Sequence, residues 1–172
     1  MKTTLRLVLI LTVIALCSNV SAQTPKWAHI NLQELILSMP EYDSAMVKLQ
    51  KFGQELEQFL EEMQVEWNRK MEDYSKNQAN WSDLVKQAKT DELTTMQQRI
   101  QTSQQQAEEN YQQEYNKLLQ PVMEKANKAV ETVAKEQGIT YVISDNPQVL
   151  IFKATGTTDL LPAVQKNLGI AR

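Results

Sequence analysis

The chain of 172 residues is poor in the residue types that build chemical sites and tight turns, with one Cys, one His, 4 Gly and 5 Pro. A single His and a single Cys exclude a His/Cys metal site, and we expect neither a metal nor a cofactor. If processing removes either residue, a Cys–His catalytic pair is excluded as well. The scarcity of Gly and Pro, beside abundant Gln, Glu, Lys, Ala and Leu, favours long helices over a turn-rich β fold.

The first 22 residues have the pattern of a secretory signal peptide. Lys2 and Arg6 precede an apolar run over residues 7–16, and small residues follow at Val20-Ser21-Ala22. We predict cleavage after Ala22. A retained signal anchor is the alternative, but the apolar run is too short for a hydrocarbon core of ~30 Å. Lipidation of Cys17 requires a small residue before it, and Leu16 is not small.

Cleavage changes the charge and the redox chemistry of the mature chain. The formal charge moves from −3 to −5, because the removed segment carries two positive charges and no negative charge. The only Cys is also removed, so disulfides cannot stabilise the mature protein in an oxidising compartment. Because no second apolar run reaches transmembrane length, we expect the mature chain to be soluble.

A strand and then a long heptad-patterned helix begin the mature chain. Residues 26–32 alternate between apolar and polar, which is typical of a short strand, and residues 33–39 predict a brief helix. His29 falls on the polar face of the strand, so we expect a surface or interface residue there. Pro40 fits the first turn of the next helix, with Ser38 as a nearby cap. The predicted seam of that helix is Tyr42, Met46, Leu49, Gly53, Leu56, Leu60, Met63 and Trp67.

A second long helix follows a break over residues 76–91. Thr90 or Asp91 can cap this helix, and Gly138 is its natural end. Two long helices separated by a short break predict an antiparallel hairpin, and the first would be roughly 55 Å long at 1.5 Å per residue. We therefore expect the hairpin to protrude from the rest of the protein. The predicted seam of the second helix includes Leu93, Met96, Ile100, Tyr111 and Leu118.

Two features of the second helix predict bending. Its seam between residues 101 and 116 is rich in Gln, and polar seam positions lower the stability of a coiled coil. Pro121 lies inside the helix, where it removes a backbone hydrogen bond and kinks the axis. Pro121 is therefore a hinge candidate, and a kink absorbed by packing is the equal alternative.

The remaining segment predicts a small β unit. Residues 139–144 and 149–152 are rich in β-forming residues, and residues 145–148 have the composition of a hairpin turn. Thr157, Thr158 or Asp159 can cap a terminal amphipathic helix that ends at Gly169. Three short strands are marginal alone, so we expect this body to oligomerise. The candidates for the body and its interface are Ile30, Leu32, Ile139, Tyr141, Ile143, Leu150 and Phe152.

The predicted fold is mainly α, with a long antiparallel coiled-coil hairpin attached to a short-stranded β body. Residues 1–22 are the signal peptide and residues 23–40 the N-terminal part of the body. Residues 41–137 are the hairpin, with its tip at about 77–91, and residues 138–172 are a C-terminal β-hairpin and helix that complete the body.

This order of elements resembles the Skp/OmpH family over essentially the whole mature chain. The most specific part, from Leu118 to Phe152, reads LLQPVMEKANKAVETVAKEQGITYVISDNPQVLIF. The resemblance implies an ATP-independent periplasmic holdase of Gram-negative bacteria. It also implies a homotrimer whose β body carries three helical tentacles, which enclose unfolded outer-membrane proteins on their way to the membrane.

The charge of this chain differs from that of the best-studied family members, which are strongly basic and have been given a lipopolysaccharide- or membrane-binding role. This chain has a sequence pI near 5.3. An acidic surface is repelled by anionic lipid, so binding to lipopolysaccharide or to a membrane is doubtful here.

Large side chains on the hairpin are either packing residues or contacts for unfolded clients. Met63, Trp67 and Tyr111 have seam spacing, which favours packing. Phe52, Phe59 and Trp81 fit the seam less well and are the candidate client contacts. A structural coiled-coil adaptor or spacer of the envelope is the alternative function. The chain shows no nucleophile–base constellation, Gly-rich phosphate loop or basic aromatic patch, which argues against an enzyme and against nucleotide or nucleic-acid partners.

Overall fold

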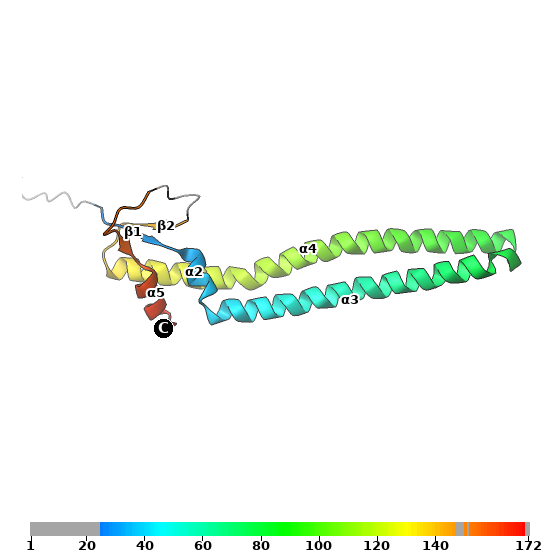
Figure 1. The fold of residues 1–172 in the computed structure, drawn as a ribbon, viewed down its shortest axis with the longest axis horizontal. Helices are drawn as coiled ribbons and strands as arrows, with labels where there is room; N and C mark the ends of the chain where they lie inside the picture. The colour runs from blue at the N-terminus through cyan, green and yellow to red at the C-terminus, as the bar shows by residue number, and fades with distance from the viewer. Residues whose placement is uncertain (1–24, 147–149, 151, 171–172) are drawn as a thin grey trace, which may run out of the picture.

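The computed structural model describes residues 25–146, 150 and 152–170. Two long helices project side by side from a small body at one end of the molecule (Figure 1). The predicted signal peptide and its cleavage after Ala22 lie outside the described residues. The elements in chain order are β1 (Trp27–Ile30), α2 (Leu32–Leu37), α3 (Pro40–Asn77), the 3-10 helix η1 (Gln78–Asn80), α4 (Asp83–Glu136), β2 (Tyr141–Ser144), β3 (Thr158–Asp159) and α5 (Leu161–Asn167).

Side-chain caps place the start of α2 but not that of α3. The Asn31 side chain accepts a hydrogen bond from the backbone N–H of Glu34 at 3.0 Å, which caps α2. Pro40 occupies the first turn of α3, as expected. The prediction that Ser38 caps α3 is wrong. Met39 holds the cap position without a side-chain bond, and the Ser38 hydroxyl instead donates to the carbonyl oxygen of Leu35 at 2.7 Å.

The turn at the tip of the hairpin is shorter than the sequence predicts. Helix α3 ends at Asn77, and α4 begins at Asp83 rather than at Thr90 or Asp91. The Ser82 hydroxyl accepts a hydrogen bond from the backbone N–H of Val85 at 3.4 Å, so Ser82 is the cap. Polar residues at 83–91 suit an exposed helix as well as a turn, which explains why their composition did not show the boundary.

Helix α4 runs unbroken through Pro121 to Glu136 and then stops at Gly138. Gly138 has a φ of +64°, a left-handed conformation that costs a glycine little and ends the helix as expected. The axis of α4 changes direction in its yellow-green section, on the body side of the middle of the hairpin (Figure 1). A proline inside a helix is an established cause of such bending.

The sheet has three strands in the order β2-β1-β3, and both pairings are parallel. Trp27 pairs with Tyr141 and His29 with Ile143, so β2 lies beside the first strand of the chain. The predicted β-hairpin after Gly138 is not formed where its second run is described. Of its second run, Leu150 and Phe152 are described and neither belongs to a strand, while residues 147–149 and 151 lie outside the described residues. The third strand is instead Thr158–Asp159.

The hydrophobic core lies between the sheet, α2, α5 and the last turns of α4. Leu35, Leu160 and Val164 are fully buried, and they share one cluster with Ala28 and Ile30. The cluster also takes Val122, Ala126, Ala129, Val133 and Ala134 from α4. The last turns of α4 thus belong to the body rather than to the hairpin, because the small sheet needs an apolar helix against its face.

The terminal helix is short and closes the core. The Asp159 carboxylate accepts a hydrogen bond from the backbone N–H of Leu161 at 2.9 Å, and Gly169 follows the helix with a φ of +72°. Within the part of the chain that the structure describes, no helix is both long and apolar enough to cross a lipid bilayer.

Candidate functional site

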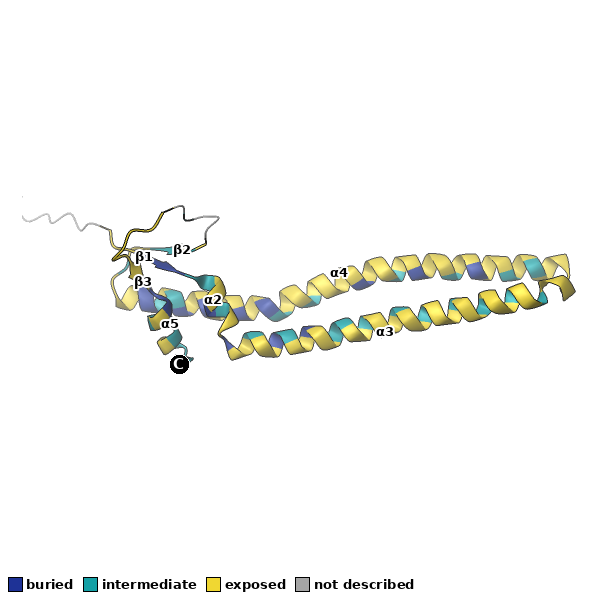
Figure 2. Cartoon of the chain, viewed as in Figure 1, coloured by how far each residue is buried: buried dark blue, intermediate teal, exposed yellow. Residues whose placement is uncertain are grey.

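The contact between α3 and α4 is a narrow stripe on an otherwise exposed arm (Figure 2). We use "arm" for the part of α3, η1 and α4 that projects beyond the body core. The predicted seam residues Leu49, Leu93 and Ile100 are buried, Tyr42, Met46, Leu56, Leu60, Met63, Trp67, Met96 and Leu118 are half-buried, and Tyr111 is 40% exposed. Ala107 is the small residue that is buried between Ile100 and Tyr111. A stripe this thin holds the helices together but leaves most of their surface open.

Near the body, a residue beside the predicted seam residue Leu118 is more deeply buried. Leu118 is half-buried, whereas its neighbour Leu119 is only 8% exposed. Leu119 and Val122 are three residues apart, the helical spacing of a shared face, and both turn toward the protein interior. The signal was present in the sequence as a second apolar residue beside Leu118.

Specific interactions tie the outer half of the arm together. The indole N–H of Trp67 donates to the carbonyl oxygen of Leu93 at 3.3 Å, across the two helices. Lys70 forms an ion pair with Glu92 at 2.5 Å, also between the helices. The hydrogen bond from Lys70 lowers the pKa of Glu92 below its ordinary value. These contacts lie between the tip and the Gln-rich middle of the arm, so the two helices are held together there by polar interactions.

The predicted client-contact residues have different environments. Phe59 is 51% exposed on α3, while Phe52 is half-buried. Trp81 is half-buried at the tip, where its ring meets that of Tyr74 edge-on at 5.7 Å. Tyr74 also accepts a hydrogen bond from the hydroxyl of Thr90 at 3.3 Å. Phe59 is therefore available to a partner, and Trp81 is mainly engaged in closing the turn.

Other large apolar side chains are exposed along the arm, beyond the three candidate client contacts. Val47 is 66% exposed and Val65 59% exposed, and Met71 is also exposed. These three residues lie outside the seam, and a heptad pattern does not predict a role for single apolar residues at such positions. Single exposed apolar residues are ordinary, but here they recur along a helix with no second layer over it.

The interface candidates of the body divide between the interior and the surface. Ile30 lies in the core of the single chain, Leu32, Ile139, Ile143 and Leu150 are half-buried, and Tyr141 and Phe152 are exposed. Trp27 and Tyr141 are paired across β1 and β2 and stack with ring centroids 4.6 Å apart, although both are about half exposed. This aromatic pair on a small sheet is an uncovered apolar feature of the body.

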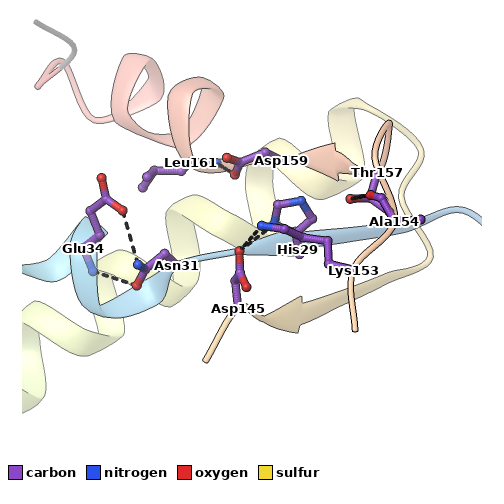
Figure 3. Close-up of polar contacts among 9 residues, drawn as sticks. All are labelled: His29, Asn31, Glu34, Asp145, Lys153, Ala154, Thr157, Asp159 and Leu161. Atoms are coloured by element: carbon purple, nitrogen blue, oxygen red, sulfur yellow. Dashed lines mark hydrogen bonds and ion pairs between the residues drawn. The ribbon is translucent and has the colours of Figure 1, made fainter. Parts of the chain in front are cut away.

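His29 is buried, which corrects the expectation of a surface position. Its side chain turns into the space between β1 and the loop after β2, where Asp145 and Lys153 meet it (Figure 3). His29 Nδ1 lies 3.3 Å from Asp145 Oδ2, and Lys153 Nζ lies 2.5 Å from the same oxygen. The hydrogen bond from Lys153 lowers the pKa of Asp145. The alternation of the strand failed here because Asp145, from the segment after β2, lies against His29, whereas Trp27 on the same face stays exposed.

The described residues contain no group of three or more His, Cys, Asp or Glu side chains that could hold a metal ion. The cavities between elements are open and lined by side chains of the arm and the body. The arrangement therefore offers extended surfaces for contact with other molecules.

The geometry agrees with a comparison against known families. A family model described as outer membrane protein (OmpH-like) matches residues 26–168. The chain belongs to the OmpH-like family. In this OmpH-like chain the matched range runs from the residue before β1 to the residue after α5, so it includes both the arm and the body.

A solved structure of similar fold is that of a candidate outer membrane chaperone (OmpH-like) from Caulobacter crescentus CB15. The two chains superpose with a TM-score of 0.72 at 13% sequence identity, over 87% of this chain and 86% of the other. At this identity the likeness shows that the OmpH-like fold of helical arm and small β body is shared. No curated protein sequence matches the chain.

Proposed function

We propose that the mature chain is an ATP-independent periplasmic holdase, which binds unfolded outer-membrane proteins and prevents their aggregation during transit. The carrying observation is the arm, whose helices contact each other along a narrow stripe and expose apolar side chains elsewhere. Membership of the OmpH-like family and the shared fold of the Caulobacter chaperone candidate support the same role.

The surface of the arm suits the capture of many different sequences. A holdase needs numerous weak contacts on an adaptable surface and no energy-consuming step. Met71, Tyr111 and Phe59 are exposed and offer polarisable or flat apolar surfaces. Because these residues are spread along the arm rather than gathered in one pocket, a bound chain can shift among them without a fixed pose.

We further propose a homotrimer assembled through the β bodies. The three short strands leave β2 and β3 as edges, and the aromatic pair Trp27–Tyr141 is uncovered in the single chain. Burial of these features against other copies would stabilise a body whose three short strands are marginally stable alone. Three arms would then surround a common space in which a client is held.

The proposed setting is the periplasm, and the proposal includes no membrane or lipopolysaccharide partner. The signal-like residues 1–22 support export, and the acidic charge opposes attachment to anionic lipid. The proposal also includes no catalytic step, nucleotide or nucleic acid.

The test is whether the mature protein keeps a urea-unfolded outer-membrane porin in solution after dilution. We expect light scattering from the porin to fall as the chaperone is added, without ATP, and to plateau at a fixed ratio of trimer to porin. A porin that aggregates as fast with the protein as without it would refute the holdase.

The same assay separates the holdase from an envelope adaptor or spacer. A spacer has a fixed folded partner and gives no protection to an unfolded porin. Protection that also extends to an unrelated unfolded barrel protein supports the holdase, because a spacer has no reason to bind both.

A further inference from the structure

Two adjoining cavities form a groove at the base of the arm, on the side that faces α2. They share Tyr42 and have volumes of about 350 and 500 Å³. The one nearer the body is lined by side chains of α2 and α4, including Leu37, Tyr115 and Met123. The one farther along the arm is lined by Met46, Val47 and Tyr111. We name the two together the base groove.

The walls of the base groove are apolar and largely uncovered. Leu37, Val47 and Met123 are each about half exposed or more, which is unusual for three large side chains around one depression. Tyr111 and Tyr115 add ring faces that are partly open to solvent. Methionine and tyrosine adapt to varied partners, so this wall accepts apolar side chains of several shapes.

The charge around the base groove has a single sign. Asp43 is the only charged residue that lines it. On α3, residues 43, 47, 50, 54, 57 and 61 follow one another at alternating steps of four and three, so Glu57 and Glu61 continue the face of Asp43 along the arm. None of these six positions is Lys or Arg. On α4, Glu108 precedes Tyr111 by three residues and shares its face.

The carboxylates on this side of the arm are not engaged in ion pairs with other described residues. Among the described residues, Glu57, Glu61 and Glu108 form no ion pair, and they lie too far inside their helices for the helix dipole to stabilise them. A separate cavity between the same two helices contrasts with this, since Lys48 and Lys117 lie there beside Glu41. Farther along α3, Arg69 shares a cavity with Glu61, Glu62 and Glu66, so carboxylates outnumber cations on the groove side of the arm.

We infer that the base groove binds unfolded segments in which Lys or Arg side chains neighbour apolar or aromatic ones, an inference that rests on the proposed holdase function. The apolar side chains of such a segment fill the groove, and the aliphatic stems of its cations lie along Met46 and Val47. The cationic groups meet the ring faces of the tyrosines and the carboxylates that continue the groove along the arm. Acidic segments of equal apolarity are repelled.

The test uses two fluorescent peptides that differ only in charge. Both are unstructured Gly/Ser chains with the same Phe residues, and one carries Lys where the other carries Glu. Fluorescence anisotropy with the full mature protein measures both affinities at low and high salt. We expect the Lys peptide to bind about tenfold more tightly at low salt, and the difference to shrink as salt screens the exposed carboxylates.

A matched pair of variants locates the binding. The double variant E61Q/E108Q removes two charges from the groove side, and E62Q/E109Q removes two charges from the adjacent positions, about 100° around each helix. All four glutamates are exposed, so neither variant disturbs the core. We expect E61Q/E108Q to weaken binding of the Lys peptide by about threefold or more, and E62Q/E109Q to leave it nearly unchanged.

Three results would overturn the inference. The Glu peptide binds as tightly as the Lys peptide, or both double variants weaken binding equally, or Met123→Ala dissociates the oligomer and thereby assigns the groove to a second copy of the chain.

The porin assay keeps the two proposals apart. Protection of the porin without a preference between the peptides refutes the groove and leaves the holdase standing. Absence of protection with the preference intact refutes the holdase alone.

Discussion

Gly53 of α3 lies directly against the ring of Tyr111 of α4, and a Cβ atom on Gly53 would be 3.3 Å from Tyr111 Cε2. The glycine allows the two helices to approach where the seam passes from Leu49 to the Gln-rich middle of the arm. Its helical backbone does not require glycine, because its φ is not positive. The role of Gly53 is therefore to leave room for the ring of Tyr111.

Gly53→Ala should stabilise the arm slightly. Alanine favours a helix by about 1 kcal/mol over glycine, and the partly exposed ring of Tyr111 can move by the few tenths of an ångström that the methyl group needs. We expect a net gain of about 0.5 kcal/mol in the free energy of unfolding, measured with urea. In a Tyr111→Ala background the gain should rise to about 1 kcal/mol. Equal losses in both backgrounds would contradict this account.

Leu35→Ala should destabilise the body strongly. The side chain is fully buried in the core cluster, and its truncation should cost about 2–5 kcal/mol. Leu37→Ala is the matched control in the same helix, because Leu37 is 51% exposed and should cost no more than about 0.5 kcal/mol. Thermal unfolding followed by circular dichroism distinguishes the two variants. Similar melting temperatures would contradict the burial of Leu35 and the exposure of Leu37 on α2.

Pro121→Ala should straighten and stabilise α4. The substitution restores a backbone donor inside the helix, and we expect a gain of about 1–3 kcal/mol. If the bend positions the arm, small-angle scattering should show a changed maximum dimension and porin protection should fall. Pro40→Ala is the control, since proline in the first helical turn removes no helix hydrogen bond. Unchanged scattering and protection in Pro121→Ala would mean that packing, not proline, sets the bend.

The stability of the arm should fall as the medium becomes acidic. The Lys70 hydrogen bond lowers the pKa of Glu92, and the Lys125 hydrogen bond lowers that of Glu41. A carboxyl whose pKa is lower in the folded state contributes its stability above the ordinary value of 4.5, and loses it as the pH falls through the lowered value. Urea unfolding between neutral pH and about pH 3 should show this loss. The double variant E41Q/E92Q should show a shallower dependence, and an equal slope would exclude these pairs as its source.

Trp27→Ala and Tyr141→Ala should weaken the proposed trimer. Each removes half of the stacked and exposed aromatic pair of the body, and loss of a large interface side chain commonly costs more than about 1 kcal/mol of binding free energy. Sedimentation at decreasing concentration should show earlier dissociation than in the parent protein. Val65→Ala, an exposed apolar residue on the arm, should leave the assembly unchanged. A monomeric parent protein would refute the trimer itself.

The sequence predicted the long helices well because their signals are local. The heptad spacing from Tyr42 to Trp67, the proline at position 40 and the glycine at position 138 each act within a few turns of helix. The candidate site was predicted less well. Phe59 is exposed as expected of a client contact, but Trp81 packs on Tyr74, and the base groove with its unpaired carboxylates was not foreseen. A groove between two helices depends on which face of each helix is turned toward the other. The spacing of apolar residues in the sequence does not show this.

The sequence by itself determined a long helical hairpin, the acidic charge of the chain, and a small body with few strands. The tertiary structure decided that β2 pairs in parallel with β1 rather than with the residues after it, and that the end of α4 covers the sheet. It also decided that His29 is buried beside Asp145 and Lys153. The physical reason is range: helix hydrogen bonds join residues four apart, whereas Trp27 and Tyr141 meet only because the whole hairpin between them folds back on itself.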